Sequence, residues 1–230
     1  MITRDAAWSA LGQVRDPELD RPITDLGFVA RIEIKPDATV RAELRLPTYF
    51  CAPNFAWLMV ADARDALAAV AEHVEVVLLE HFVSVEINAG VAAVSEFAAS
   101  FDADGLDPDL AELRETFERK AHVAAQERLA RALIAGGADP ASLARMAVTA
   151  AAARAPDETA GVLRRRTRLG LRSDFALCDD DGAALPAERL PGWLRFARTV
   201  RVSIDGNAGF CRGLLETRYA LPPGDLALPR

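Results

Sequence analysis

Hydrophobic and polar positions alternate along one stretch near the N-terminus, "ARIEIKPDATVRAELRL". The apolar members of this alternation are Ile32, Ile34, Val40, Ala42, Leu44 and Leu46. A period of two is that of a β-strand with one buried face, and "KPDAT" in the middle carries the proline and aspartate that favour a turn. The pattern predicts a β-hairpin with one face buried.

Apolar residues recur at helical intervals in the segments before and after this hairpin. Before it, "TRDAAWSALGQV" offers Thr3 as an N-cap and places Ala7, Leu11 and Val14 on one helical face. After it, "NFAWLMVADARDALAAV" has helical spacing, and "VEVVLLE" has the composition of a short buried strand. Because a helical crossover then leads from the hairpin to a third strand, we expect a small α+β domain whose sheet is covered by helices.

The pattern changes at about residue 84, where alanine-rich helical sequence begins. Asp107 and Asp139 each precede a proline, and these pairs predict helices at roughly 108–135 and 140–154. Farther on, "FALC" and "TVRVSID" have the composition of strands. The expected fold class is therefore α+β, with a largely α-helical extension and a mixed C-terminal segment packed on the rest. The predicted segments are 1–84, 85–155 and 156–230.

The amino-acid composition and the net charge indicate which kinds of partner the protein can bind. The chain is 51% hydrophobic and 27% charged, as is usual for a soluble globular protein, and its formal net charge is -7. A negative protein lacks the excess of Lys and Arg that general nucleic-acid or anionic-membrane binding requires. The N-terminal sequence has no signal-peptide pattern and no apolar run long enough to span a bilayer. We therefore expect a cytoplasmic protein with no nucleic-acid or membrane partner.

A lone cysteine, Cys51, lies between the second hairpin strand and the next helix in "LRLPTYFCAPNFAW". If Pro53 occupies the first turn of that helix, the thiol lies just ahead of the helix N-terminus. Unpaired backbone N–H groups and the helix dipole favour a thiolate there, which is a nucleophile and a soft metal ligand. The alternative is a buried apolar cysteine that only fills space.

Four carboxylates precede the hairpin, in "DPELD" and "TDLG". They are Asp16, Glu18, Asp20 and Asp25. Loop carboxylates often serve turns and caps, and Gly27 after "DL" indicates a positive φ angle or a close backbone approach. In the predicted topology this loop lies at the end of the sheet where the strand into Cys51 also ends. Carboxylate and thiol would then share one pocket.

Taken in order, these motifs resemble a known family. "VRDPELDRPITDLGFVARIEI", a hairpin, and then "LPTYFCAPNFAWLM" are similar to the metal-sulfur (iron-sulfur) cluster assembly domain family, which includes SufT-like and PaaD-like proteins. The resemblance covers about residues 4–82 and leaves a long C-terminal extension. Unlike the common family pattern, the loop "TYFCAP" has no glycine before the cysteine, and Tyr49 and Phe50 are expected to shield the thiol.

The resemblance implies a maturation factor for an iron-sulfur or other iron-dependent client enzyme, such as a multicomponent oxygenase. Cys51 would contact iron or a labile cluster, and two protomers would bridge one cluster as a homodimer. Partners would be the client metalloenzyme or other assembly proteins. The implied metal-site residues are Cys51, Asp16, Glu18 and Asp25. Thr48, Gly27, Tyr49 and Asn54 are expected to line the site.

The extension adds further candidates. Cys178 and Cys211 are secondary thiol candidates, although no CxxC spacing supports a shared metal site. The basic run "LRRRTRLGLR" is either a solvated helix face or a docking surface for an acidic client; its members are Arg164, Arg165, Arg166 and Arg168. The three histidines, His73, His81 and His122, lie in unrelated contexts and are expected to serve structure.

Two other functions remain open from the residues. One is a metal-free adaptor in which Cys51 is structural. The other is a thiol-dependent enzyme with Cys51 as nucleophile, although the sequence shows no histidine base beside it. We expect an assembly factor or adaptor and not a catalyst.

Overall fold

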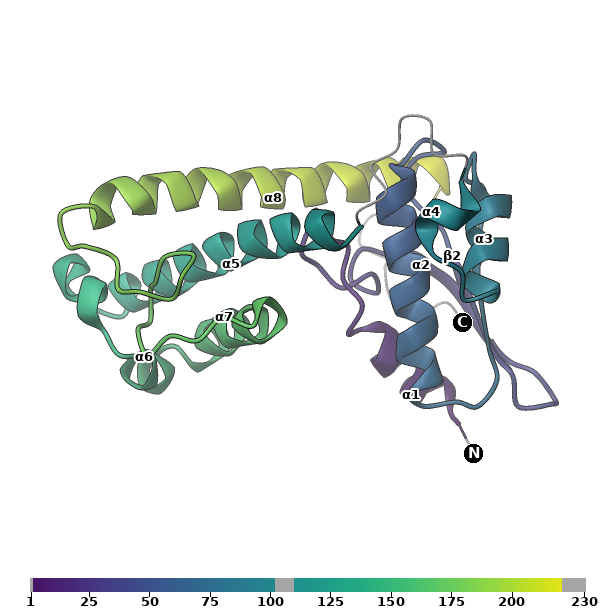
Figure 1. Ribbon diagram of the computed structural model, residues 1–230, viewed down its shortest axis with the longest axis horizontal. Coiled ribbons are helices and arrows are strands. Elements are labelled where there is room, and N and C mark those ends of the chain that lie inside the picture. The colour runs from purple at the N-terminus through teal and green to yellow at the C-terminus, as the bar shows by residue number, and fades with distance from the viewer. Residues whose placement is uncertain (1, 102–109, 221–230) are drawn as a thin grey trace. The chain divides into compact units, whose positions relative to one another are not determined.

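The computed structural model describes residues 2–101 and 110–220 (Figure 1). The chain forms two compact units: unit 1 contains the residues up to 110 and those from 207 onward, and unit 2 contains residues 111–206. The predicted segments 1–84, 85–155 and 156–230 do not coincide with these units. The difference arises because the end of the last helix returns to pack on the N-terminal core.

Unit 1 contains the predicted order of helix, hairpin, helix and strand. Its elements are α1 (Arg4–Leu11), β1 (Val29–Ile34), β2 (Val40–Leu44), α2 (Pro53–Ala68), β3 (Val74–Leu78), α3 (Ser84–Ala92) and α4 (Phe97–Ser100). The Thr3 hydroxyl accepts a hydrogen bond from the Ala6 amide at 3.2 Å, so the predicted N-cap is confirmed. The hairpin and the crossover strand are confirmed as well, since β1 pairs antiparallel and β3 pairs parallel with β2.

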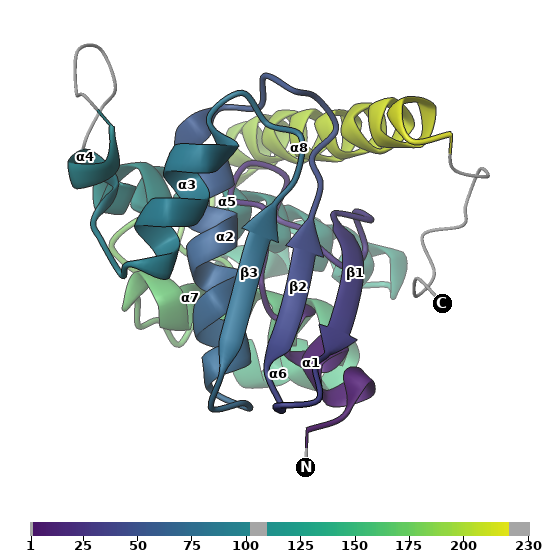
Figure 2. The same ribbon diagram turned by 90° about the vertical axis from the view of Figure 1, so that its right-hand side faces the viewer.

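The sheet has the order β1-β2-β3, and its register brings three loops together at one end. Because β2 and β3 run in the same direction, Leu44 and Leu78 end side by side, and Leu44 also pairs with Val29 at the start of β1. In Figure 2 the arrowheads of β2 and β3 point to the top of the view, whereas that of β1 points down. We call this the loop end of the sheet. The loops at residues 15–28, 45–52 and 79–83 all meet it.

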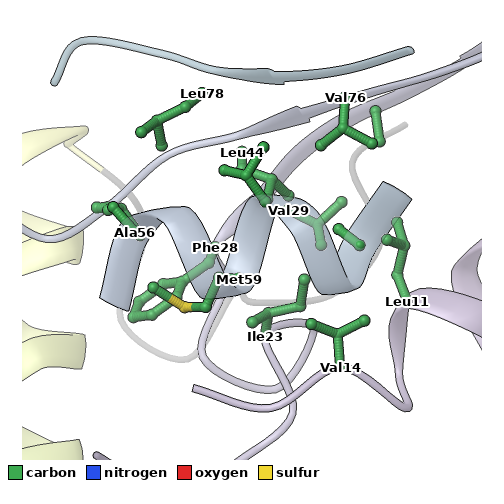
Figure 3. Close-up of a cluster of buried hydrophobic side chains, with 14 of the residues drawn as sticks. Leu11, Val14, Ile23, Phe28, Val29, Leu44, Ala56, Met59, Val76 and Leu78 are labelled. Atoms are coloured by element: carbon green, nitrogen blue, oxygen red, sulfur yellow. The ribbon is translucent and has the colours of Figure 1, made fainter. Parts of the chain in front are cut away.

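One face of the sheet packs on helix α2 and the other is polar. Figure 3 shows Leu44 and Leu78 pointing toward α2, with Phe28 and Met59 beside them. Leu44, Leu78 and Phe28 are almost wholly buried, and burial of each such side chain contributes about 1.5 to 3 kcal/mol. On the opposite face Arg41 forms ion pairs with Glu43 and Glu75. The prediction of a single buried face is confirmed except for Ile34, which is 36% exposed at the end of β1.

Unit 2 is helical. Its elements are most of α5 (Leu110–Ala135), the 3-10 helix η1 (Pro140–Arg145), α6 (Val148–Arg154), α7 (Pro156–Leu169) and the first part of α8 (Leu190–Arg218). Asp139 caps η1 by accepting from the Ala141 amide at 3.1 Å. The predicted single helix over 140–154 is divided, because Met146 and Ala147 have extended backbone angles. Asp107, the other predicted cap, lies outside the described residues.

Within unit 2, α5 and the first part of α8 lie side by side (Figure 1). Arg128 on α5 donates to Asp205 on α8 at 2.8 Å, and Arg201 on α8 forms an ion pair with Glu127 on α5. Arg201 also reaches Asp205 at 2.9 Å. Charged side chains therefore link the two helices across their contact.

The predicted strands of the C-terminal segment are not present. "TVRVSID" lies inside α8, because its buried positions follow a helical spacing through Ala197, Ile204 and Ala208. "FALC" contributes only isolated bridges, between Ala147 and Phe175 and between Cys178 and Ala184. The α+β class with a largely helical extension is confirmed, and the described part of the C-terminal segment contains no named strand.

None of the helices within residues 2–101 and 110–220 combines the length and the apolar composition that a membrane span requires.

Candidate thiol and carboxylate site

Cys51 lies in the loop between β2 and α2, at the loop end of the sheet. Its side chain is a free thiol and is partly buried. The Thr48 hydroxyl oxygen lies 3.3 Å from the Cys51 sulfur, and the Phe50 amide donates to the same oxygen at 3.2 Å. Since the amide occupies an acceptor position of the hydroxyl, the hydroxyl proton is available to the sulfur. Thr48 is therefore placed to donate a hydrogen bond to a thiolate.

His81 fixes the backbone of the same loop. Its side chain is buried, and Nε2 lies 2.7 Å from the Cys51 carbonyl oxygen. Because a carbonyl can only accept, Nε2 carries the proton. Burial, together with the charge of Arg218, lowers the pKa of His81 against the opposing effect of that carbonyl. A neutral imidazole thus positions the Cys51 loop without contacting the sulfur. In the sequence, the position of His81 just after a buried strand indicates that it lies at the loop end of the sheet. Its contact with Cys51 could not be predicted, because the two residues are 30 positions apart.

The "DPE" loop contributes a buried carboxyl and a half-buried one. Asp16 is only 7% exposed, and its Oδ1 accepts from the Leu19 amide at 2.8 Å. Burial raises the pKa of Asp16 to about 6; the Leu19 amide opposes this shift and the charge of Glu18 adds to it. Glu18 Oε1 accepts from the Asn207 side-chain amide on α8 at 3.2 Å. This loop therefore meets the returning end of α8.

Residues 207–218 of α8 pack on the core of unit 1. Ala208 and Leu215 are buried in the same cluster as the sheet. Arg218 donates to the Leu46 carbonyl at 3.1 Å and to the Glu80 carbonyl at 2.7 Å, so it joins the segments that lead into Cys51 and His81. The end of α8 is thereby held against the loop end of the sheet.

This packing brings a second thiol, Cys211, to the carboxylates and Cys51. Cys51 and Cys211 are both partly buried against the same hydrophobic cluster. Burial raises the pKa of Cys211 to about 11, and the negative charges of Asp16, Cys51 and Glu18 add to the shift. We call these four residues the thiol site. The loops that carry Cys51, Asp16 and Glu18 thus meet at one end of the sheet, and the charges of all three residues act on Cys211.

Other predicted residues serve the backbone nearby. Asp25 is exposed, and its carboxylate accepts from the neighbouring Thr24 hydroxyl at 3.4 Å. Gly27 has a φ of 75°, which an L side chain rarely adopts, so it is required for the turn into β1. Asn54 Oδ1 accepts from the Phe55 amide at 2.9 Å in the first turn of α2. These hydrogen bonds therefore join Asp25 and Asn54 to their sequence neighbours, Thr24 and Phe55.

Cys178 belongs to a hydrogen-bonded cluster inside unit 2. Arg166 Nη2 donates to the Cys178 sulfur at 3.2 Å, and Arg166 Nε donates to His122 Nε2 at 3.2 Å. The Gln126 side chain bonds both backbone groups of Cys178, accepting from its amide at 2.7 Å and donating to its carbonyl at 3.3 Å. Burial raises the pKa of the Cys178 thiol. These four residues, which we call the unit 2 cluster, are packed as a core element.

The same contacts correct the prediction of an arginine docking surface. Arg165 and Arg166 are 7% and 3% exposed, so neither can present a guanidinium to a client. The sequence pattern was misleading because α7 turns these two side chains inward while it leaves Arg164 and Arg168 exposed. Arg168 forms an ion pair with Glu118 at 2.9 Å.

Three exposed aromatic side chains lie in the Cys51 loop and in the neighbouring loop at residues 79–83. Tyr49, Phe50 and Phe82 are 46%, 76% and 44% exposed, and their ring centroids lie 5.0 to 6.2 Å apart. We call them the aromatic patch. The rings contact one another and each is at least 44% exposed to solvent. Contiguous exposed apolar groups of this kind mark interaction sites.

The described residues contain no complete metal site. Within residues 2–101 and 110–220, no three His, Cys, Asp or Glu side chains are arranged so that they could hold a metal ion. Two thiols and two carboxylates nevertheless supply the ligand types that iron and iron-sulfur clusters take.

An α+β domain that presents a cysteine loop and a carboxylate loop at one end of its sheet agrees with the comparisons to known proteins. Residues 4–78 match the family described as "Iron-sulfur cluster assembly protein". The predicted resemblance is confirmed for this region, which is about a third of the chain.

Curated relatives match a shorter stretch. Over 43 residues the chain is 51% identical to the "Iron-sulfur cluster carrier protein" of Mycobacterium bovis (strain ATCC BAA-935 / AF2122/97), which covers 19% of this chain and 11% of the relative. Proteins of that name from Mycobacterium tuberculosis strains CDC 1551 / Oshkosh and ATCC 25618 / H37Rv give the same values. The match thus spans about a tenth of the length of these curated relatives. No solved structure matches the chain.

Proposed function

We propose that this protein matures an iron-sulfur or other iron-dependent client enzyme, and that Cys51 contacts the iron or a labile cluster as cargo. The observation that carries the proposal is the position of Cys51, a partly exposed thiol fixed by His81 and offered a hydrogen bond by Thr48. Thiolates are the ligands of iron-sulfur clusters, and nearby carboxylates supply hard oxygen ligands or accept the thiol proton.

Incomplete coordination suits transient holding of cargo. A structural site encloses its metal with a full set of protein ligands, whereas a site with fewer ligands leaves positions open to an incoming partner. The described residues offer no closed set of three or more ligands. A client can therefore displace the cargo ligand by ligand, and a second protomer that supplies its own Cys51 would bridge one cluster as a homodimer.

The partner would dock beside the thiol. The aromatic patch adjoins the Cys51 loop through the hydrogen bond from the Phe82 amide to the Tyr49 carbonyl, at 3.2 Å. Exposed aromatic residues are favoured at protein interfaces, and here they would seat the client next to the cargo. Independently of that surface, the exposed Arg164 on unit 2 would attract an acidic client. A multicomponent oxygenase is the client class that PaaD-like members suggest.

The test is anaerobic purification followed by measurement of iron and acid-labile sulfide in wild type, Cys51→Ala and Cys178→Ala. The proposal expects the Cys51→Ala variant to lose bound iron and the Cys178→Ala variant to keep it. Cys178 is the matched control, since it is a free thiol of the same chain that lies inside unit 2. Iron retained after loss of Cys51 would contradict the proposal.

The aromatic patch also favours a second candidate, a metal-free adaptor. In that case all three proteins would lack iron, and proteins from the native host would still bind to Cys51→Ala as strongly as to wild type. A thiol-dependent enzyme has less support, because His81 donates its Nε2 proton to the Cys51 carbonyl and does not reach the sulfur as a base. An assembly role without catalysis is therefore preferred.

A further inference from the structure

Cys211 lies on the one face of α8 that contacts the N-terminal domain. Asn207, Cys211, Leu215 and Arg218 are spaced by four, four and three residues, which places their side chains along one stripe of a helix. Leu215 is fully buried in the core of unit 1 and Cys211 and Arg218 are partly buried, so this part of the stripe faces inward, whereas Asn207 is exposed. Cys211 is partly buried on that stripe and lies outside the region that matches the family.

Polar contacts on both sides of Cys211 fix where the stripe lies. Asn207 donates to Glu18 of the "DPE" loop, and Arg218 donates to the Leu46 carbonyl just ahead of the Cys51 loop. With a rise of 1.5 Å per residue, Cys211 lies about 6 Å along the helix axis from Asn207 and about 10 Å from Arg218. Its side chain therefore projects between the carboxylate loop and the cysteine loop.

We propose that Cys211 and Cys51 form a two-thiol site that binds the cargo iron through both sulfur atoms. The proposal rests on the proposed function and deepens it, because it assigns a ligand from the C-terminal extension to the site of the N-terminal domain. The effect of the Cys51 charge on the Cys211 thiol agrees with this proximity.

Two sulfur ligands from one chain are half of the four cysteine ligands that a [2Fe–2S] cluster takes. Each iron takes two of these thiolates, so the pair would cap one iron and leave the other to ligands from outside. Each thiol would release its proton when it binds, and the positive charge of the metal would offset the negative charges of Asp16 and Glu18. A pair of thiols also holds cargo more firmly than one thiol, while it still leaves positions open for transfer.

A cadmium titration tests the pair directly, because Cd²⁺ is a soft cation and its bonds to thiolates absorb in the ultraviolet. The full chain is reduced, kept free of oxygen and titrated with Cd²⁺ alone, as wild type, Cys211→Ser, Cys51→Ser and Cys178→Ser. We expect one tight Cd²⁺ per wild-type chain at the pair, and loss of either member to reduce the sulfur-to-cadmium absorbance at this site to about half. Cys178→Ser is the matched control and should leave that absorbance unchanged.

The outcomes separate this proposal from the proposed function. If Cys211→Ser keeps the full absorbance and the full iron content while Cys51→Ala loses its iron, the two-thiol site is refuted and the proposed function stands. If Cys51→Ala keeps its iron, the proposed function itself fails. Half absorbance in both single variants supports the pair.

A measurement on the wild-type chain guards against a variant that fails to fold. Dibromobimane becomes fluorescent when both of its arms have reacted with neighbouring thiols. The pair predicts an intramolecular cross-link between the peptides that contain Cys51 and Cys211, which mass spectrometry of the digested protein identifies. Prior addition of Cd²⁺ should block the reaction. Absence of this cross-link in folded protein, with both thiols singly modified, would overturn the proposal.

Discussion

The two units each bury a cysteine-containing polar cluster, and they differ in how the polar atoms are used. In the unit 2 cluster Arg166 donates to His122, to Cys178 and to the carbonyls of Phe175 and Ala176, and Gln126 bonds both backbone groups of Cys178. In the thiol site, burial and then the charge of Glu18 raise the pKa of the Asp16 carboxyl to about 6. One cluster is held closed by hydrogen bonds, and the other keeps its ionisable groups available.

This difference separates a structural cysteine from a presented one. A buried polar cluster whose members are all paired rigidifies the core, whereas a buried carboxyl next to another carboxylate costs folding free energy when it ionises. A carboxyl whose pKa is strongly shifted by burial and a neighbouring charge marks a candidate functional site. We therefore expect substitutions in the unit 2 cluster to reduce stability and substitutions in the thiol site to reduce iron binding.

The largest effect is expected from Arg166→Ala. This change leaves the Phe175 and Ala176 carbonyls without their donor inside unit 2, and each buried polar group left without a partner costs about 1 to 3 kcal/mol. Urea unfolding followed by circular dichroism measures the loss. Arg164→Ala, an exposed neighbour on the same helix, is the control and should change stability by less than about 0.5 kcal/mol. Equal effects of the two substitutions would contradict the structural role of the unit 2 cluster.

Acidification should destabilise unit 2 through His122. Burial, and then the charges of Arg166, Arg165 and Arg119, lower the pKa of His122 to about 4, against about 6.5 in the unfolded chain. Because the folded state binds the proton more weakly, this stability is present above pH 6.5 and is lost as the pH falls toward 4. The shift corresponds to about 3 kcal/mol at full protonation.

The measurement is the free energy of unfolding at a series of pH values between about 7 and 4. His122→Gln removes the titrating group and keeps an acceptor for the Arg166 Nε–H, so the decrease in stability over this range should become smaller by about the same amount. An unchanged pH dependence in His122→Gln would show that another group titrates there.

Local patterns were enough to predict the N-terminal fold. Alternation in the hairpin, helical spacing in α1 and α2, and the crossover to β3 all depend on residues close in sequence, and each was confirmed. "TVRVSID" was assigned to a strand because Val, Ile and Thr favour strands, but the packing of Ile204 and Ala208 along α8 overrides that preference. The period of the buried positions could be read only with the flanking residues included.

The site was predicted in part, for a similar reason. Asp16, Glu18 and Cys51 follow from topology, since their loops meet the same end of the sheet. Cys211 and His81 enter through contacts that span long stretches of chain, and no local pattern indicates which face of α8 returns to unit 1. Conversely, the burial of Arg166 could not be read from a basic run, because charge alone does not show which side of a helix faces the core.

Asp16→Asn should raise stability at neutral and alkaline pH. The raised pKa means that the folded state favours the protonated carboxyl, so its contribution to stability is full below about pH 4 and is lost as the pH rises through about 6. Asparagine stays neutral and can still accept from the Leu19 amide. We expect a gain of about 1 to 3 kcal/mol at pH 8 that disappears near pH 4.

Asp25→Asn, an exposed carboxylate in the same loop, is the control and should be neutral within about 0.5 kcal/mol at both pH values. If Asp16 serves the cargo, the stabilised Asp16→Asn variant should also bind less iron. A variant that is more stable and binds iron as well as wild type would remove Asp16 from the functional set.

The smallest effect on stability is expected at the aromatic patch. Phe50 is 76% exposed, so Phe50→Ser should change the free energy of unfolding by less than about 0.5 kcal/mol. Phe28→Ser, in the core of the same unit, is the contrasting control and should cost more than about 3 kcal/mol. The same Phe50→Ser protein should keep its iron, because the ring contacts Tyr49 and Phe82, and the Phe50 amide that bonds Thr48 is retained.

Partner binding should respond where stability does not. Quantitative mass spectrometry of proteins captured from the native host should show weaker capture of iron-enzyme clients by Phe50→Ser than by wild type. Because exposed aromatic residues contribute to binding mainly when a partner covers them, a folded, iron-loaded variant that loses its client would assign the patch to docking and Cys51 to cargo. If Phe50→Ser captures clients and binds iron as well as wild type does, the aromatic patch does not take part in client recognition. The client would then bind another surface of the chain.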